Sequence, residues 1–260
     1  RGLPAPDGDA VAVVPQLRAV RKSHDPLVLV NSPRSEGAEA FRTLRTSLAT
    51  PNRGEENRVF LFVSAVPGEG KTFCSINYAA SLAQLGLKTL LIDVDLRKPA
   101  IEAGLLGKDS DHVGITDYLA GRSKLEEVVR PTKSENLFFI SGGTTAPSPA
   151  ELLAKGGLDA LVGNASQDYD RVVLDSAPIN AVSDTLLVLK NVQSVCLVVR
   201  AARTSRRYML RCVQLLLDAK APLSGTVLNR MPRRRGLGRG AYYDYGYHGK
   251  YGKKGVYGAR

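Results

Sequence analysis

Residues 59–85 constrain the fold of this chain more than any other stretch. They begin with five consecutive apolar residues, 59–63, a pattern that is typical of a strand buried on both faces of a parallel sheet. A loop that contains Gly68 and Gly70 follows, and residues 73–85 then carry apolar side chains at helical spacing. A strand, a glycine-bearing loop, a Lys-Thr pair and a helix in this order predict a phosphate-binding loop.

Each part of this loop has a chemical role. Gly68 and Gly70 let main-chain N–H groups turn inward around phosphate oxygens, and the following helix adds its free N–H groups and positive dipole end. Lys71 brings a positive charge to the β- and γ-phosphates, and the Thr72 hydroxyl is placed to bind Mg2+. Ala65 stands where the usual pattern has its first glycine. A chance glycine turn before a core helix is the alternative, and the flanking strand and helix argue against it.

Three aspartates follow two further predicted strands. Asp93 and Asp95 come after the apolar run 90–92, and Asp175 comes after the run 172–174. Ligands bind at the carboxyl ends of parallel strands, and carboxylates beside a triphosphate require a cation such as Mg2+ between them. Asp175 is typical of a Walker B aspartate, which holds Mg2+. For Asp93 and Asp95 the alternative is a pair of turn carboxylates that cap the next helix.

Strand-like and helical segments alternate along the rest of the chain. This alternation predicts the α/β class, as a three-layer P-loop NTPase fold with a mostly parallel central sheet. Asn229 follows the last predicted strand, where it either reads the edge of an adenine or is a simple turn residue. The further predicted strands are 137–140, 195–199 and 223–228, and the further predicted helices are 35–48, 115–119, 124–129, 150–162 and 205–219.

Composition divides the chain into three parts. Residues 1–31 are rich in Pro, Gly, Ala and Asp and predict a linker, with a short strand or docking segment near residues 11–14. Residues 32–231 form the predicted globular domain. Residues 232–260 lack aliphatic periodicity and predict a flexible tail. The three cysteines and three histidines have no metal-ligand spacing, so we expect reduced thiols and no protein-ligated metal cluster.

The tail carries most of the positive charge. It holds eight Lys or Arg and one Asp, so +7 of the net charge of +11 lies there. Because the body keeps only +4, the bulk charge does not indicate nucleic-acid binding. Basic residues mixed with aromatics suit single-stranded nucleic acid, an anionic membrane surface, or the supply of phenols as substrates, and the tail alone leaves these open. Its tyrosines are Tyr242, Tyr243, Tyr245, Tyr247, Tyr251 and Tyr257.

The predicted helix 35–48 adds a further motif. Glu39, Arg42 and Arg45 recur at three-residue spacing on one face, where the default reading is a solvated face with internal ion pairs. With the two Walker motifs, the Asp-x-Asp motif and the tyrosine cluster, this helix makes the chain similar to the bacterial tyrosine kinases, the BY-kinase family of polysaccharide copolymerase proteins. The resemblance extends from about residue 32 to the end, and all five motifs occur in the same order.

The resemblance implies a role for each motif. Asp95 and Asp175 would hold Mg2+ together with Thr72, while Asp93 would help to deprotonate the acceptor tyrosine. ATP would contact the loop. Glu39, Arg42 and Arg45 would assemble a homo-oligomeric ring, in which the tail tyrosines of one subunit are phosphorylated by its neighbour. The residues implied in nucleotide binding are Gly68, Glu69, Gly70, Lys71, Thr72, Phe73, Arg97 and Asn229.

The resemblance also implies partners and a location. We expect regulation of capsular or exopolysaccharide synthesis or export, and an activating membrane segment of a copolymerase in the same or another polypeptide. Protein tyrosine substrates and a tyrosine phosphatase are further expected partners, and nucleic acid is not. The expected location is the cytoplasmic side of the bacterial inner membrane.

Two other functions remain to be weighed. A Min/Par-type ATPase switch shares the P-loop architecture, but such proteins usually carry a lysine early in the loop, and here no lysine precedes Lys71 between residues 65 and 70. They also lack a tyrosine-rich terminus. A nucleic-acid or membrane-binding module that uses the basic aromatic tail is the other alternative.

Overall fold

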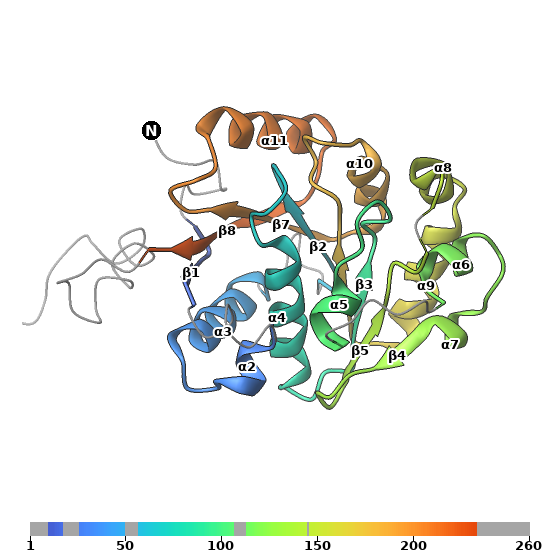
Figure 1. Cartoon of the computed structure of the whole chain (residues 1–260), viewed down its shortest axis with the longest axis horizontal. Helices are drawn as coiled ribbons and strands as arrows, with labels where there is room; N and C mark the ends of the chain where they lie inside the picture. Colours follow the sequence, from blue (N-terminus) through green and yellow to red (C-terminus); the bar gives the residue numbers. More distant parts are fainter. Residues whose placement is uncertain (1–9, 18–25, 50–56, 107–112, 145, 233–260) are drawn as a thin grey trace, which may run out of the picture.

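The computed structural model describes residues 10–17, 26–49, 57–106, 113–144 and 146–232. These residues form one eight-stranded sheet with helices on both faces (Figure 1). The strand order is β1-β8-β7-β2-β6-β3-β5-β4, and every neighbouring pair is parallel except the antiparallel pair β4–β5 at one edge. The predicted α/β class with a mostly parallel sheet is therefore confirmed.

The elements have the following bounds. The strands are β1 (Ala12–Pro15), β2 (Val59–Ser64), β3 (Thr89–Asp93), β4 (Val129–Pro131), β5 (Leu137–Ile140), β6 (Arg171–Asp175), β7 (Ser194–Arg200) and β8 (Leu223–Met231). The helices are α2 (Val28–Asn31), α3 (Glu36–Leu48), α4 (Lys71–Ala83), α5 (Ile101–Leu106), α6 (Ile115–Leu119), α7 (Leu125–Val128), α8 (Pro149–Ala154), α9 (Gly157–Asp168), α10 (Asp184–Val188), the 3-10 turn η1 (Leu189–Asn191) and α11 (Arg206–Asp218).

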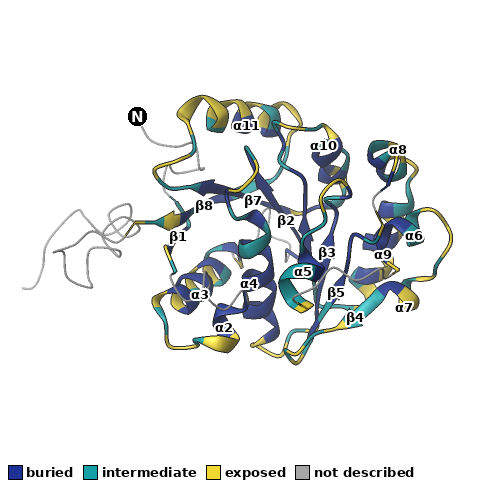
Figure 2. Ribbon diagram, viewed as in Figure 1, coloured by how far each residue is buried: buried dark blue, intermediate teal, exposed yellow. Residues whose placement is uncertain are grey.

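The central strands are apolar on both faces, which explains why their sequences lack polar alternation. Successive side chains of a strand point to opposite faces, so Phe60 and Phe62 of β2 pack with α3 and α4, whereas Leu61 and Val63 pack with α9 and α11. Both rings also contact Tyr78, with centroids 5.2 and 5.3 Å away. Two buried layers therefore flank the sheet, as the dark central strands of Figure 2 show.

The globular body begins before residue 32, where the sequence had suggested its boundary. Strand β1 pairs in parallel with β8, with Ala12 opposite Val227. Leu27, Val28 and Leu29 are buried in the layer that α3 and α4 cover. Part of the predicted linker is therefore an edge strand and a core segment.

Two other predictions about secondary structure need correction. The predicted helix 150–162 is two helices, α8 and α9, because the chain turns at Gly156, which has a φ of 83°. Residues 129–131 form strand β4 rather than the end of a helix. The predicted flexible tail falls on residues 233–260, which lie outside the described residues.

Two further features concern the state of the cysteines and the length of the helices. Cys74, Cys196 and Cys212 are buried free thiols, as predicted. Among the described residues, no helix combines the length and the hydrophobicity that a bilayer-spanning segment requires.

Candidate functional site

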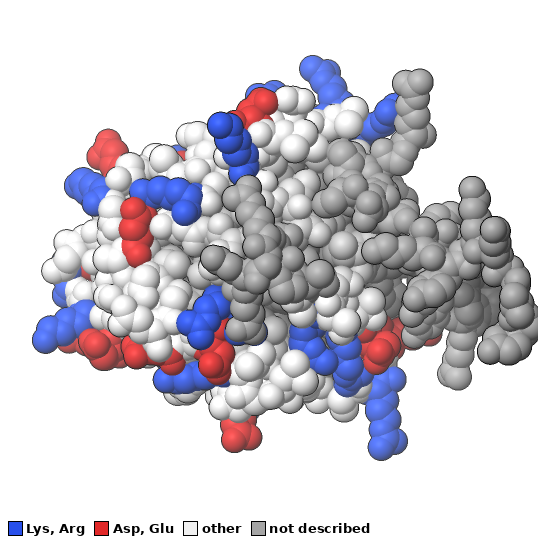
Figure 3. Space-filling model, turned by 180° about the vertical axis from the view of Figure 1, so that it is seen from behind, with Lys and Arg blue, Asp and Glu red and all other residues white. Residues whose placement is uncertain are grey.

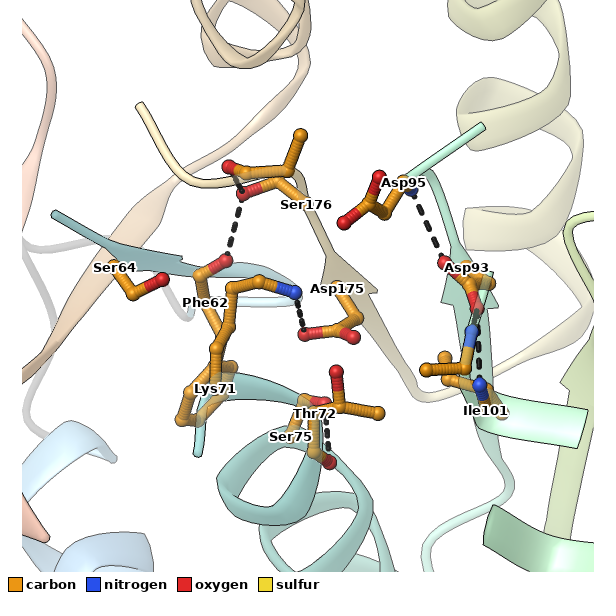
Figure 4. Close-up of polar contacts among 12 residues, drawn as sticks. Phe62, Ser64, Lys71, Thr72, Ser75, Asp93, Asp95, Ile101, Asp175 and Ser176 are labelled. Atoms are coloured by element: carbon orange, nitrogen blue, oxygen red, sulfur yellow. Dashed lines mark hydrogen bonds and ion pairs between the residues drawn. The ribbon is translucent and has the colours of Figure 1, made fainter. Parts of the chain in front are cut away.

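The carboxyl ends of three neighbouring strands bring the predicted site residues together. Strand β6 lies between β2 and β3, and Asp175 at the end of β6 is directly opposite Asp93 at the end of β3. Lys71 is the first residue of α4, which follows β2 through the glycine-bearing loop. Figure 4 shows Lys71, Asp175, Asp93 and Asp95 around one space at this edge of the sheet.

The loop between β2 and α4 has the backbone that phosphate binding requires. Gly68 and Gly70 have φ values of 82° and 93°, which a residue with a side chain rarely adopts. A Cβ on Gly68 would meet no other atom within 4 Å, so the space beside it is open. Gly70 provides no side-chain cap for α4, and the first N–H groups of this 13-residue helix are left for an anion.

Lys71 and Asp175 form a buried ion pair. The lysine Nζ donates to Oδ1 of Asp175 at 2.7 Å, and both side chains are nearly inaccessible to solvent. The other oxygen of Asp175, Oδ2, is buried and has no hydrogen-bond partner among the described residues. A buried carboxylate oxygen without a donor is costly, so Oδ2 is suited to a ligand such as a metal-bound water.

Asp93 is fully buried and holds the backbone of the loop that follows β3. Its Oδ1 accepts from the Asp95 N–H at 3.1 Å, and its Oδ2 accepts from the N–H groups of Ala100 and Ile101 at 2.8 and 3.0 Å. Burial, and next to it the charge of Asp175, raise the pKa of Asp93 to about 7. In this conformation the carboxylate is therefore close to the site but covered.

Asp95 and Thr72 face the open side of the site. Asp95 is half-buried, and its Oδ1 accepts from the Lys98 N–H at 3.1 Å. Burial raises the pKa of this carboxylate. Figure 4 shows the hydroxyl of Thr72 pointing toward Asp175 and the Asp95 carboxylate directed into the same space. Among the described residues, no group of three or more His, Cys, Asp or Glu side chains is placed to hold a metal ion.

Three predicted nucleotide-binding residues use their side chains in other contacts. The Phe73 ring packs edge-on against Phe41, with centroids 5.6 Å apart, so only its main chain is available to phosphates. The Glu69 carboxylate is buried and turns inward, where it accepts from the Val66 N–H at 2.9 Å. Asn229 is also buried, and its Nδ2 donates to the Glu69 carbonyl at 2.9 Å. The adenine contact predicted for Asn229 stays a prediction.

Arg97 lies at the rim of the site. Its Nε and Nη2 donate to the two oxygens of Asp184 at 2.6 and 3.1 Å, and the carboxylate is buried whereas the guanidinium is 45% exposed. This pair joins the loop after β3 to the start of α10. The partner Asp184, like Thr204, which donates to the Glu69 carboxylate, was missed from the sequence. No local pattern links residues more than 80 positions apart.

The three residues predicted for ring assembly lie on α3. Arg42 pairs with Glu39 at 3.0 Å and also donates to the Pro33 carbonyl at 2.7 Å. Arg45 points instead toward α4, where its Nη1 donates to the Ser81 carbonyl at 2.6 Å. The predicted phosphoacceptor tyrosines, Tyr242, Tyr243, Tyr245, Tyr247, Tyr251 and Tyr257, lie outside the described residues.

Charged side chains of both signs are interspersed on one face of the molecule. Figure 3 shows this face from behind, where Lys and Arg alternate with Asp and Glu over the described residues. A wide area of one sign, such as a nucleic-acid interface requires, is not visible on that part of the surface.

The sequence resembles characterised kinases. A family model described as an AAA domain matches residues 58–217. The tyrosine-protein kinase YwqD of Bacillus subtilis is 30% identical over 223 residues, which cover 86% of this chain and 91% of YwqD. The tyrosine-protein kinase etk of Escherichia coli is 33% identical over 82% of this chain, but the match spans only 29% of that longer protein.

Solved structures agree with this result. The kinase domain of the Escherichia coli tyrosine kinase ETK superimposes with a TM-score of 0.81 at 31% identity, over 91% of this chain and 98% of that domain. The septum site-determining protein MinD of Pyrococcus horikoshii, complexed with Mg-ADP, has a TM-score of 0.58 at 24% identity over 72% of this chain and 76% of MinD. The second likeness shows the fold alone, and both structures agree with the predicted α/β fold.

Proposed function

The chain belongs to the bacterial tyrosine-protein kinases, and we propose that it transfers the γ-phosphate of ATP to the tyrosines of its own C-terminal tail. The observation that carries the proposal is the convergence of Lys71, Asp93, Asp95 and Asp175 at the ends of β2, β3 and β6. A phosphate-binding loop and three carboxylates at one strand edge match the requirements of phosphoryl transfer, in which the protein mainly positions groups and neutralises charge.

The phosphate-binding loop would hold ATP as substrate. The N–H groups of Gly68, Gly70 and the first turn of α4 would donate to phosphate oxygens. Lys71 would turn from Asp175 toward the β- and γ-phosphates, because their combined negative charge exceeds that of one carboxylate. Glu69 and Phe73 would contribute main-chain donors, and Arg97 would border the phosphates from the rim.

The donor set fits Mg2+. The unpaired Oδ2 of Asp175, the half-buried Asp95 and the Thr72 hydroxyl are oxygen ligands of the kind that this ion prefers. When bound, Mg2+ would neutralise charge on the β- and γ-phosphates.

Asp93 would accept the proton of the acceptor tyrosine. A phenol with a pKa of about 10 is a weak nucleophile at neutral pH, and a carboxylate with a pKa of about 7 is well matched to take its proton. Because Asp93 is covered by the loop after β3, this role requires that loop to move when the tyrosine enters. Asp95 already faces the site and would orient the phosphates with Mg2+.

Phosphorylation would occur between subunits. A flexible coil of this length has a typical end-to-end distance of about 25–30 Å, so the predicted flexible tail would be long enough to reach a neighbouring site. Glu39, Arg42 and Arg45 on α3 would join subunits into a ring. Each phosphotyrosine adds about −1.5 to −2 charges, so modification would turn the basic tail net negative and release it from the ring.

The biological setting belongs to the same proposal. We place the protein in capsular or exopolysaccharide synthesis or export, at the cytoplasmic side of the inner membrane. A cytoplasmic segment of a copolymerase would activate it, and a tyrosine phosphatase would reverse the modification. The structure of the chimeric protein CapA2B2 is similar, with a TM-score of 0.79 at 26% identity, and this composite protein supports a kinase that works with a second segment.

Incubation with labelled ATP and Mg2+ tests the proposal. The expected result is phosphotyrosine at Tyr242–Tyr257, mapped by mass spectrometry, and its absence from a Lys71→Met chain. ATP hydrolysis without phosphotyrosine would instead support a Min/Par-type switch. Binding of single-stranded nucleic acid or anionic vesicles without phosphotransfer would support the binding-module alternative.

A further inference from the structure

Asn229 of β8 is hydrogen-bonded to the phosphate-binding loop. Its side chain is 1% exposed and makes two hydrogen bonds, one from Nδ2 to the Glu69 carbonyl at 2.9 Å and one to Oδ1 from the Arg230 N–H at 2.8 Å. Its own carbonyl accepts from the Ala201 N–H at 2.8 Å. The residue is therefore fixed on both its main chain and its side chain.

The contact with the loop is too close for any other residue at position 70. A Cβ on Gly70 would lie 2.1 Å from Nδ2 of Asn229. The glycine thus serves two purposes, since it adopts a φ of 93° and also makes room for the amide that holds the preceding carbonyl. Asn229 and Gly70 form an interlocking pair at the base of the loop.

The Glu69 side chain fixes the same loop from the other side. Its carboxylate accepts from the Val66 N–H at 2.9 Å and from the hydroxyl of Thr204, between β7 and α11. Arg200 at the end of β7 also lies 3.5 Å from the Gly68 carbonyl. Both sides of the Glu69 peptide are therefore held by β7, β8 and the loop itself.

We propose that Asn229 is a positioning residue that acts on the phosphates of ATP through the Glu69 backbone and has no contact with the adenine. Orienting the Glu69 carbonyl fixes the peptide that joins Glu69 to Gly70, and with it the N–H of Gly70 that would face the phosphates. A carbonyl left without its buried donor would favour other loop conformations. This inference rests on the proposed nucleotide site and concerns how that site is held in shape.

A positioning role and an adenine contact predict different results with a ligand that has no base. The experiment compares full-length parent, Asn229→Ala and Asn229→Asp chains for the KM of ATP and for the inhibition constant of inorganic tripolyphosphate. Asn229→Asp keeps the volume and the acceptor for Arg230 but removes the donor, so it serves if the alanine variant folds poorly. We expect both constants to rise together, by about 5- to 100-fold. The ratio of kcat/KM for ATP to kcat/KM for inosine triphosphate, which differs from ATP in its base, should stay unchanged.

Asn77→Ala is the matched control. Asn77 is another buried asparagine that binds only main-chain groups, the carbonyls of Pro26 and Phe73 and the N–H of Val28. This variant should lose stability in urea without changing either constant. An increase in the KM of ATP with an unchanged tripolyphosphate constant would show a base contact and overturn the inference, as would unchanged constants in both Asn229 variants. A parent chain without phosphotransfer would instead overturn the proposed function.

Discussion

Lys71 Nζ lies 2.7 Å from Oδ1 of Asp175, and both side chains are buried, at 7% and 1% exposure. In this arrangement each charge compensates the other in an environment that does not solvate them. Binding of a triphosphate would draw the ammonium away, and the carboxylate would then need Mg2+ as a new partner. In the proposed mechanism the pair would therefore couple binding of phosphate by the lysine to binding of Mg2+ by the aspartate.

Lys71→Met should lose both activity and stability. Without the ammonium, tail phosphorylation should fall about 100- to 1,000-fold, since a charge-stabilising donor is removed. The Asp175 charge would also be buried alone, at a cost of about 3–5 kcal/mol in the free energy of unfolding. Phosphotyrosine yield and urea unfolding measure the two effects.

A double variant separates these effects. Lys71→Met combined with Asp175→Asn removes both charges of this pair, so its unfolding midpoint should return toward that of the parent while activity stays lost. If the single variant were as stable as the parent, the ion pair would not have the importance that its burial suggests.

Activity should depend on the protonation of Asp93. Its pKa is raised to about 7 because burial and the charge of Asp175 disfavour the ionised form. Only the ionised carboxylate accepts a proton, so the rate at subsaturating ATP should rise with pH and level off above about 7, falling by about tenfold per unit below it. Initial rates of tail phosphorylation between pH 5.5 and 9 test this.

Asp93→Asn should lose most activity and with it this pH dependence. The affinity for an unreactive ATP analogue, measured over the same pH range, controls for titration of the nucleotide itself. A parent rate that does not change between pH 6 and 8 would argue that another group accepts the tyrosine proton.

Local sequence patterns predicted much of the sheet and the position of the site. The unbroken apolar runs of β2 and β6 identify strands that are covered on both faces, and the polar residue that ends each run marks the edge where ligands bind. Lys71, Asp93 and Asp175 could be placed together because parallel strands carry their carboxyl ends to one edge.

Other features depend on contacts between distant residues. The sequence cannot show that Asp93 turns back to the N–H groups of Ala100 and Ile101, or that Asn229 reaches the Glu69 carbonyl, since both follow from how the loops pack. The short apolar run near residues 11–14 suggested a strand or a docking segment, but the sequence could not show that this strand pairs with β8 at the edge of the sheet.

Substitutions on α3 should separate assembly from folding. Arg45 donates to the Ser81 carbonyl at 2.6 Å, so Arg45→Ala should lower the free energy of unfolding by about 1–2 kcal/mol. Glu39→Ala removes only an exposed ion pair and should cost about 0.5 kcal/mol or less. If α3 forms the ring interface, both variants should reduce the oligomer mass in light scattering. An unchanged mass in both would move the interface elsewhere.

A chain that ends at Pro232 tests whether the tail is phosphorylated by a neighbour. This truncated chain retains every site residue from the phosphate-binding loop to Asn229 but has no tail tyrosine. Mixed with full-length Lys71→Met protein and ATP, it should place phosphotyrosine on the inactive chain, because one copy supplies the site and the other supplies the phenols. Mass spectrometry distinguishes the two chains by length.

The same mixture identifies the acceptor tyrosines, and the concentration dependence of the rate shows whether the reaction is between two chains. Replacing the six tail tyrosines of the Lys71→Met chain by phenylalanine should abolish labelling, and the initial rate for the parent alone should rise faster than linearly with its concentration until the ring forms. Two results together would contradict this: the parent is labelled at a rate per molecule that does not change on dilution, and the Lys71→Met chain in the mixture is not labelled. They would require each tail to react in the site of its own chain. The tail begins directly after β8, which pairs with β7 beside β2, and the mixed experiment decides between the intramolecular and the intermolecular path.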